Sequence, residues 1–274
     1  MSSAVIQKLK ELGYTTISEE FYGQVDLWES WYVGKVKGFH QYRRYNGHKW
    51  TKHNRATLSM GKKVCEDWAN LLMNEKVKIT LEGKKEQDFI DRVLAENNFT
   101  VKANEMQEMK SALGTVAYIP RVTGQGVTDS GEIIPGDASS IVIDYATMHD
   151  IYPLAWQNGF IYDCAFTSRV TRDGKNYVYF QIHRRANDGT YVIENRIYRY
   201  QNEQLSDEDL KNVSGFEHIP PVVYTGSNKR QFVIDKPNIA NNFNYLLPVG
   251  ISVFANSIDV LRGVDACLLY TSPS

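Results

Sequence analysis

The most regular alternation of apolar and polar positions lies in residues 57–81. Apolar side chains recur there every three or four residues, which predicts an amphipathic helix with one buried face. This stripe consists of Met60, Val64, Trp68, Leu71 and Leu72. The period changes to two over about 76–81, which predicts a strand directly after the helix. We expect Trp68 to be buried against a sheet, so that Trp68→Ala costs about 3–5 kcal/mol.

Helical periodicity continues in four further stretches. They are residues 4–12, the segment that follows Ser18, and about 85–97 and 101–113. Ser18 is suited to an N-cap, because its hydroxyl can accept a hydrogen bond from a free backbone N–H. Gly114 follows the last of these stretches, where a positive φ ends helices. We therefore expect this helix to lead into a strand.

The second half of the chain is dominated by strand patterns. Strands are predicted at about 115–122, 140–145, 160–171, 176–185 and 190–200, and a short one at 222–224. Asp173-Gly174 and Asp188-Gly189 can supply the positive φ values that two-residue hairpin turns need. The stretches 123–139 and 201–222 are polar and are predicted to be loops. The sequence therefore predicts an α+β fold in which N-terminal helices pack on an antiparallel sheet or meander.

A final apolar helix is predicted after Pro248. Its stripe consists of Ile251, Phe254, Ile258, Leu261, Val264 and Leu268. No later segment of the sequence can cover this stripe, so we expect part of it to be exposed and the chain to be incomplete. We divide the chain into a domain of residues 1–245 and the start of a truncated helix in 246–274. Residues 268–274 have the character of a foreign tail.

One segment concentrates the positive charge. Nine Lys and Arg residues and no acidic residue lie in 35–63, so the rest of the 274-residue chain, whose net charge is −1, carries 22 bases against 32 acids. Asn46-Gly47 predicts a hairpin or loop in this segment. Aromatic residues are interleaved with the bases, a composition that can hold phosphates and stack on nucleic-acid bases. The candidate residues for a nucleic-acid or subunit contact are Lys35, Lys37, Arg43, Arg44, Lys49, Lys52 and Arg55.

Catalytic and metal-binding patterns are absent from the sequence. Cys65, Cys164 and Cys267 are about a hundred residues apart, which fits neither a disulfide framework nor a metal cluster. The histidines have no recognised zinc spacing, and the glycines form no phosphate loop or dinucleotide motif. We therefore expect no enzyme activity, no cofactor and no metal. The first residues lack the apolar core of a signal peptide, and no apolar run is long enough to span a bilayer, so we expect a cytosolic protein without membrane contact.

The order of elements resembles that of a known family. Four stretches carry the likeness: MGKKVCEDWANLLMNEKVKI at 60–79, SALGTVAYIPRV at 111–122, YATMHDIYPLAWQNGFIYDCAF at 145–166, and KPNIANNFNYLLPVGISVFANSIDVLRGVD at 236–265. In these stretches the chain resembles the portal, or head–tail connector, proteins of long-tailed double-stranded-DNA phages. The resemblance implies that residues 1 to about 245 form a wing domain and that the last helix begins the stem. The family's clip, channel-lining segments and crown would follow beyond residue 274.

The resemblance also implies a function and a set of partners. Portal subunits form a ring of about twelve copies at one capsid vertex, through which DNA is packaged and ejected. The implied partners are other copies of the chain, the major capsid protein, the terminase, a head–tail adaptor and double-stranded DNA. The implied location is the virion after assembly in the host cytoplasm. Because assembly surfaces would be missing, we expect this chain to aggregate or stay monomeric and not to close a ring.

Two alternatives belong to other functional classes. A nucleic-acid-binding protein that uses residues 35–63 would bind DNA in a salt-dependent manner. An enzyme with an unrecognised pocket would show acidic and histidine side chains gathered in a cleft.

Overall fold

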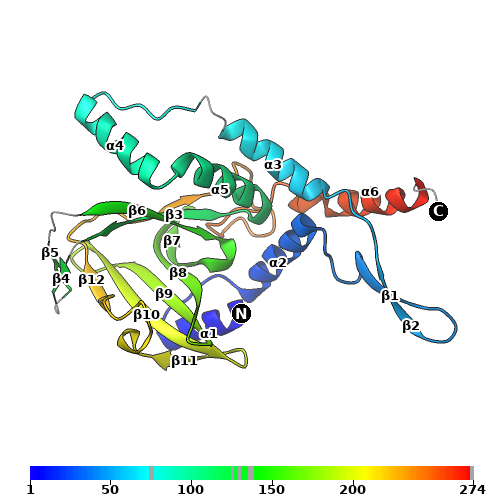
Figure 1. Cartoon of the computed structure of the whole chain (residues 1–274), viewed down its shortest axis with the longest axis horizontal. Coiled ribbons are helices and arrows are strands. Elements are labelled where there is room, and N and C mark those ends of the chain that lie inside the picture. The colour runs from blue at the N-terminus through cyan, green and yellow to red at the C-terminus, as the bar shows by residue number, and fades with distance from the viewer. Residues whose placement is uncertain (74–76, 125, 129–130, 135–138, 272–274) are drawn as a thin grey trace.

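A six-stranded antiparallel sheet forms the centre of the fold (Figure 1). The computed structural model describes residues 1–73, 77–124, 126–128, 131–134 and 139–271. The strands of this sheet are β7 (Ile151–Gln157), β8 (Phe160–Arg172), β9 (Lys175–Arg185), β10 (Tyr191–Gln201), β11 (Gln204–Glu208) and β12 (Val222–Tyr224). Their order is β11-β10-β9-β8-β7, with β12 beside the first residues of β10. The meander confirms the predicted antiparallel architecture, although β7 and β11 were not anticipated.

The turns between the long strands explain part of this meander. Asp173 and Gly174 both have positive φ, 50° and 71°, in the tight turn that joins β8 to β9. The next connection spans residues 186–190 and is longer than the predicted two-residue turn, with Gly189 at φ +86°. The stretch predicted as a polar loop at 201–222 contains β11 and the 3₁₀ turn η2 (Leu210–Asn212).

A smaller antiparallel sheet lies beside the first. It consists of β3 (Val116–Thr123), β6 (Ser140–Thr147) and β13 (Val233–Asp235), in the order β13-β3-β6. The β3–β6 connection carries the short hairpin of β4 (Gly126–Val127) and β5 (Ile133–Ile134). The 3₁₀ turn η1 (Met148–Asp150) joins β6 to β7 and so links the two sheets.

Six helices are described. They are α1 (Ser2–Glu11), α2 (Glu19–Val33), α3 (Met60–Leu72), α4 (Lys84–Glu96), α5 (Phe99–Leu113) and α6 (Ile258–Thr271). Together with the antiparallel sheets they make the fold α+β, as predicted. In Figure 1, α3, α4 and α5 lie along one side of the molecule, and α6 projects from the body.

The main core lies between α1, α2 and the sheets. The ring of Tyr22 stacks on that of Tyr152 with centroids 5.0 Å apart, and its hydroxyl donates a hydrogen bond of 2.7 Å to the carbonyl of Ile151. Trp28, one turn and a half further along α2, is fully buried. Satisfying the buried hydroxyl removes the main cost of placing tyrosine in a core. Phe21 and Val25 are buried as well, so the helix predicted after Ser18 packs its apolar side into the core.

The segment before α6 enters the core without helical structure, which corrects the predicted helix start. Ile251 and Phe254 are buried, yet the helix begins only at Ile258, after the 3₁₀ turn η3 (Ala255–Ser257). A close backbone approach fixes this path. Gly114 has φ +84°, and a Cβ on it would lie 2.5 Å from the carbonyl oxygen of Gly250. Glycine is therefore needed at 114 both for its conformation and for the space.

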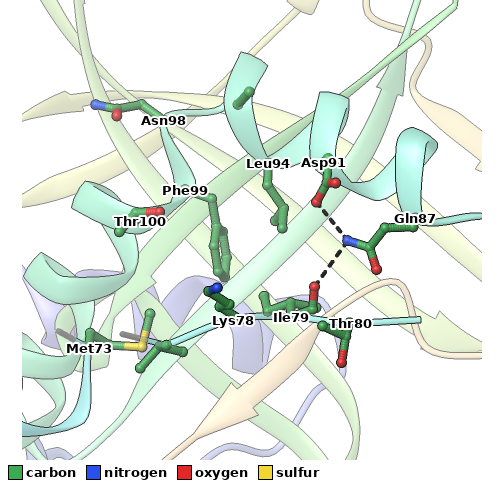
Figure 2. Close-up of a pocket in the computed structure, with 12 residues that line it drawn as sticks. Met73, Lys78, Ile79, Thr80, Gln87, Asp91, Leu94, Asn98, Phe99 and Thr100 are labelled. Carbon is green, nitrogen blue, oxygen red and sulfur yellow. Dashed lines mark hydrogen bonds between the residues drawn. The ribbon is translucent and has the colours of Figure 1, made fainter. Parts of the chain in front are cut away.

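The strand predicted at about 76–81 is wrong. Lys76 lies outside the described residues, and 77–81 are extended but form no ladder with a described strand. The side chain of Gln87 on α4 contacts this segment instead, because its amide accepts a hydrogen bond from the N–H of Leu81. The same amide donates to the carbonyl of Ile79 (Figure 2). A pocket of about 490 Å³ lies between this segment and the facing residues of α4 and α5.

The predicted burial of Trp68 is also wrong. Trp68 is 50% exposed, and Met60, Leu71 and Leu72 are exposed as well, so the apolar stripe of α3 faces outward. The buried positions of α3 are the small residues Gly61, Cys65 and Ala69, which permit close packing. The physical cause is visible in the polar contacts that hold the other side of α3.

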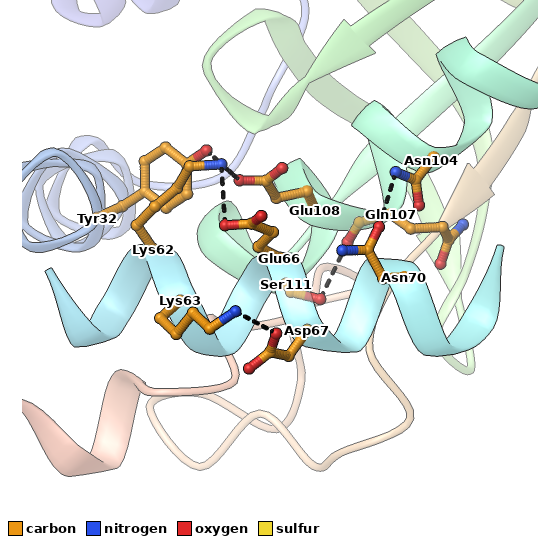
Figure 3. Close-up of polar contacts among 10 residues, drawn as sticks. All are labelled: Tyr32, Lys62, Lys63, Glu66, Asp67, Asn70, Asn104, Gln107, Glu108 and Ser111. Carbon is orange, nitrogen blue, oxygen red and sulfur yellow. Dashed lines mark hydrogen bonds and ion pairs between the residues drawn. The ribbon is translucent and has the colours of Figure 1, made fainter. Parts of the chain in front are cut away.

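These polar contacts join α3 to α2 and α5 (Figure 3). The ammonium group of Lys62 pairs with the carboxylate of Glu108 on α5, which also accepts a hydrogen bond from the hydroxyl of Tyr32 on α2. Burial and this hydrogen bond raise the pKa of Tyr32 to about 12. On the next turns, Asn70 accepts from the side-chain amide of Asn104 at 3.3 Å. The network orients α3, so its apolar stripe is left on the surface.

The last helix is half-covered. Ile258 and Leu261 pack against the main core, whereas Val260 is exposed. Val260 lies outside the predicted stripe, whose described members on this helix, Ile258, Leu261 and Val264, are half-buried. The helix continues to Thr271, and residues 272–274 of the predicted tail lie outside the described residues.

Candidate functional site

The basic segment folds into a projecting β-hairpin, as the Asn-Gly signal predicts. Its strands are β1 (Gln41–Tyr45) and β2 (Trp50–Asn54), and we call residues 41–54 the arm. In the turn, Gly47 has φ +94°, and the side chain of Asn46 accepts hydrogen bonds from the N–H groups of His48 and Lys49. The arm extends away from the body near the start of α3 (Figure 1).

The structure spreads the seven predicted contact residues along this arm and its base. Arg43 and Arg44 lie on β1, Lys49 in the turn and Lys52 on β2. Lys35 and Lys37 precede the arm, and Arg55 follows it at the base. Six of them are exposed, and Arg55 is half-buried. The seven basic residues therefore all lie on the arm or at its base.

The two faces of the arm differ in chemistry. On one face Arg43 lies opposite Lys52 and Tyr45 lies opposite Trp50, and all four side chains are exposed. We call these four residues the cationic face. Like charges directly opposite each other in a sheet are destabilising. The two opposed cations therefore do not stabilise the hairpin, and they are available to bind a partner.

The other face of the arm packs toward the base. The ring of Tyr42 stacks on His53 with centroids 5.5 Å apart. The guanidinium of Arg55 lies over Phe39, 4.1 Å from the ring centroid, and also over Tyr42. Cation–π contacts of this kind are worth about 0.5–2 kcal/mol. They hold the arm in one orientation relative to the body.

A buried hydrogen bond ties the base of the arm to α6. The Nε2 atom of His40 lies 2.8 Å from Asp265, and its Nδ1 accepts a hydrogen bond from the N–H of Val36, which places the ring proton on Nε2. The same carboxylate accepts hydrogen bonds from the N–H of Leu58 and the hydroxyl of Thr57. These hydrogen bonds outweigh burial and lower the pKa of Asp265. No local pattern predicts this pair, because 225 residues separate its members.

One group of described side chains has the composition of a metal site. Asp26, Glu29 and His149 each offer an atom within 4.8 Å of the others. However, the two ring nitrogens of His149 face different carboxylates, at 3.5 Å from Asp26 and 3.3 Å from Glu29. An imidazole presents only one nitrogen to a given ion, so this arrangement suits an ion-paired histidine better than a ligand set. It adds two exposed carboxylates to the surface of α2.

The buried titratable groups do not form a catalytic arrangement among the described residues. Burial raises the pKa of the Cys65 thiol to about 12 and that of Cys164 well above its usual range, so neither is an activated nucleophile. His183 is buried between aromatic rings, and burial lowers its pKa to about 3.

Within the described residues, no helix has the length and hydropathy needed to cross a membrane.

Comparison with known families gives one match. A family model described as "Phage portal protein, SPP1 Gp6-like" matches residues 13–239. The match covers the arm, α3 and both sheets, and it ends before the buried segment that leads into α6. A comparison with curated proteins finds no match.

Proposed function

Because the chain belongs to the phage portal protein family of the SPP1 Gp6-like type, we propose that it is a subunit of the ring through which double-stranded DNA enters and leaves a phage capsid. The observation that carries the proposal is the family match over residues 13–239. Proteins of this role act by assembly and not by chemistry. The buried, inert state of Cys65 and Cys164 is consistent with a structural function.

The proposed division of the chain follows from this role. Residues 1–245 would form the wing of the subunit, and 246–274 would begin the stem. One feature supports the division: α6 projects beyond the body (Figure 1), although Ile251 and Phe254, which precede this helix, belong to the main core. The pair of His40 and Asp265 would then set the angle between wing and stem.

The proposed partners are those of a portal. Copies of the chain would form a ring of about twelve at one capsid vertex. The ring would contact the major capsid protein, the terminase during packaging and the head–tail adaptor afterwards. The protein would assemble in the host cytoplasm and remain in the virion.

Uncovered surfaces on the body support assembly. The outward stripe of α3 exposes Trp68, Leu71 and Leu72 next to each other on one helix. Contiguous apolar side chains of this size are typical of surfaces that are buried by a partner.

A second candidate function, direct nucleic-acid binding, is favoured by the composition of the arm and its base. The residues that would contact phosphates are Lys35, Lys37, Arg43, Arg44, Lys49, Lys52 and Arg55.

Electron microscopy of the complete product of the gene that encodes this chain tests the main proposal. We expect closed rings of one size with a central channel. Sedimentation velocity should give one discrete species of the same mass. A protein that stays monomeric over the concentration range of phage assembly would contradict the portal role.

The second candidate function is tested by DNA binding. The chain should bind a random 30-base-pair duplex, as measured by fluorescence anisotropy, with an affinity that falls steeply between about 50 and 200 mM salt.

A further inference from the structure

The two cations on the cationic face of the arm have no acidic partner among the described residues. In the part of the chain that the structure describes, neither Arg43 nor Lys52 forms an ion pair. Beside them Trp50 is 66% exposed and Tyr45 53% exposed. An isolated two-stranded hairpin is only marginally stable in water. The face therefore combines unpaired charge and exposed aromatic surface on an element that gains stability from a partner.

The chemistry of this face selects an anionic partner with some apolar surface. Two cations on neighbouring strands lie about 4.5–5.5 Å apart at Cβ. Carboxylates at positions i and i+3 of a helix are about 5–6 Å apart, so a helix with that spacing can meet the two cations one to one. The partner most suited to the arm is thus a helix that carries paired acidic side chains.

The chain itself contains such a helix. On α2, Asp26 and Glu29 have the i, i+3 spacing, and their side chains are 68% and 49% exposed, although each also lies beside a ring nitrogen of His149. Glu19 lies seven residues before Asp26, on the same side of the helix. Val33, four residues after Glu29, adds exposed apolar surface at the end next to the arm. We call Glu19, Asp26, Glu29 and Val33 the acidic side of α2.

Charge balance favours a second copy over nucleic acid. Outside residues 35–63 the chain carries 22 bases and 32 acids, so the body repels a polyanion and attracts a basic arm. Seven residues separate the end of α2 at Val33 from the start of the arm, which points away from the body (Figure 1). The described contacts include none between the cationic face and the acidic side of its own α2. An arm that reaches the next copy in one direction forms a heterologous contact, the kind that closes rings.

We propose that the cationic face of the arm docks on the acidic side of α2 in a neighbouring copy of this chain. In this arrangement Arg43 and Lys52 pair with Asp26 and Glu29, and the aromatic pair covers Val33. The inference rests on the proposed ring, and it specifies a contact that the family assignment does not supply.

A charge-exchange experiment on the complete gene product tests this contact. The double variant Arg43→Glu, Lys52→Glu should lose rings in sedimentation velocity, or require at least about tenfold more protein to form them. Adding Asp26→Lys and Glu29→Lys to the same chain should restore them, because the charges are exchanged and not removed. The matched control is Lys84→Glu, Lys85→Glu at the start of α4, which should leave rings intact. All six positions are exposed, and circular dichroism should show unchanged folding for every variant, including the one that removes the contacts of Asp26 and Glu29 with His149.

A second measurement does not depend on ring formation. Chains with Arg43→Cys and chains with Glu29→Cys, both carrying Cys267→Ser, are mixed under mild oxidation. We expect a disulfide-linked heterodimer by mass spectrometry and little homodimer of either chain. Its absence would overturn the proposed contact even if rings form. If the heterodimer forms but no rings do, the portal role fails and the contact stands.

Nucleic acid is the competing occupant of the cationic face. If Arg43→Glu, Lys52→Glu leaves rings intact but abolishes salt-dependent binding of duplex DNA, the face binds nucleic acid and the proposed contact is wrong. Loss of rings without recovery in the charge-exchanged variant would also overturn it, because some other surface would then receive the arm.

Discussion

Replacement of His183 by leucine should remove a large part of the acid sensitivity of this protein. The side chain is 1% exposed on β9, and neither ring nitrogen has a hydrogen-bond partner among the described residues. Its ring stands edge-on to Phe166 and Phe232, with centroids 5.4 and 5.5 Å away. A charged imidazolium would have no counter-ion in this apolar site. Burial therefore lowers the pKa of His183 to about 3 from 6.5.

The sign of the pH dependence follows from proton binding. Below pH 6.5 the unfolded chain protonates His183, whereas the folded chain does so only near pH 3. The unfolded state thus binds the extra proton, and the free energy of unfolding falls as the pH is lowered through this window. Each pH unit is worth about 1.4 kcal/mol, so the loss at pH 5 relative to pH 7 is about 2 kcal/mol.

Urea unfolding monitored by tryptophan fluorescence measures this difference. The free energy of unfolding of His183→Leu should lose about 2 kcal/mol less than that of the parent chain between pH 7 and pH 5. At pH 8 the variant should be more stable by about 1–3 kcal/mol, because two unsatisfied polar atoms leave the core. His48→Leu, in the exposed turn of the arm, is the control and should retain the parent pH dependence. An equal pH dependence in His183→Leu and the parent would refute the reasoning.

Three further substitutions test other parts of the structure by the same unfolding measurement. Gly114→Ala should cost at least about 1 kcal/mol, because alanine disfavours φ +84° and its Cβ would meet Gly250; a neutral effect would contradict this path of the backbone. Asp265→Ala should cost at least about 2 kcal/mol, because it leaves buried donors, including that of His40, without an acceptor, whereas Asp259→Ala on the exposed side of α6 should cost little. Trp68→Ala should cost less than about 1 kcal/mol in the monomer, in place of the 3–5 kcal/mol expected of a buried tryptophan, and should instead reduce self-association.

Local sequence patterns were sufficient to predict the elements whose structure depends on residues close in the sequence. The Asn46-Gly47 turn produced the arm, because positive φ and the side-chain acceptor of asparagine act within three residues. Gly114 ended α5 for the same kind of reason. The apolar face of α2 was predictable because its stripe is broad, and most of its members are buried even though Tyr32 at its end joins the polar network with Lys62 and Glu108. The basic character of the arm also followed directly from composition.

Tertiary structure alone decided which surface each element presents. Apolar periodicity predicted that α3 has an apolar face, but Lys62, Glu108 and Tyr32, from three different helices, turned that face outward. The alternation in about 76–81 predicted a strand, but a strand needs a ladder partner, and the side chain of Gln87 bonds to the backbone of Ile79 and Leu81 instead. Periodicity is a property of one element, whereas burial depends on what the rest of the chain brings against it.

The candidate site shows the same division. The seven basic residues could be named from the sequence, because charge density is local. Their separation into a cationic face and a packed face required the register that sets Arg43 opposite Lys52 and Tyr45 opposite Trp50. The anchoring of the arm by Asp265 required a contact across 225 residues, which no local pattern encodes. Sequence determined the chemistry of this surface, and the pairing of distant segments determined where that chemistry can act.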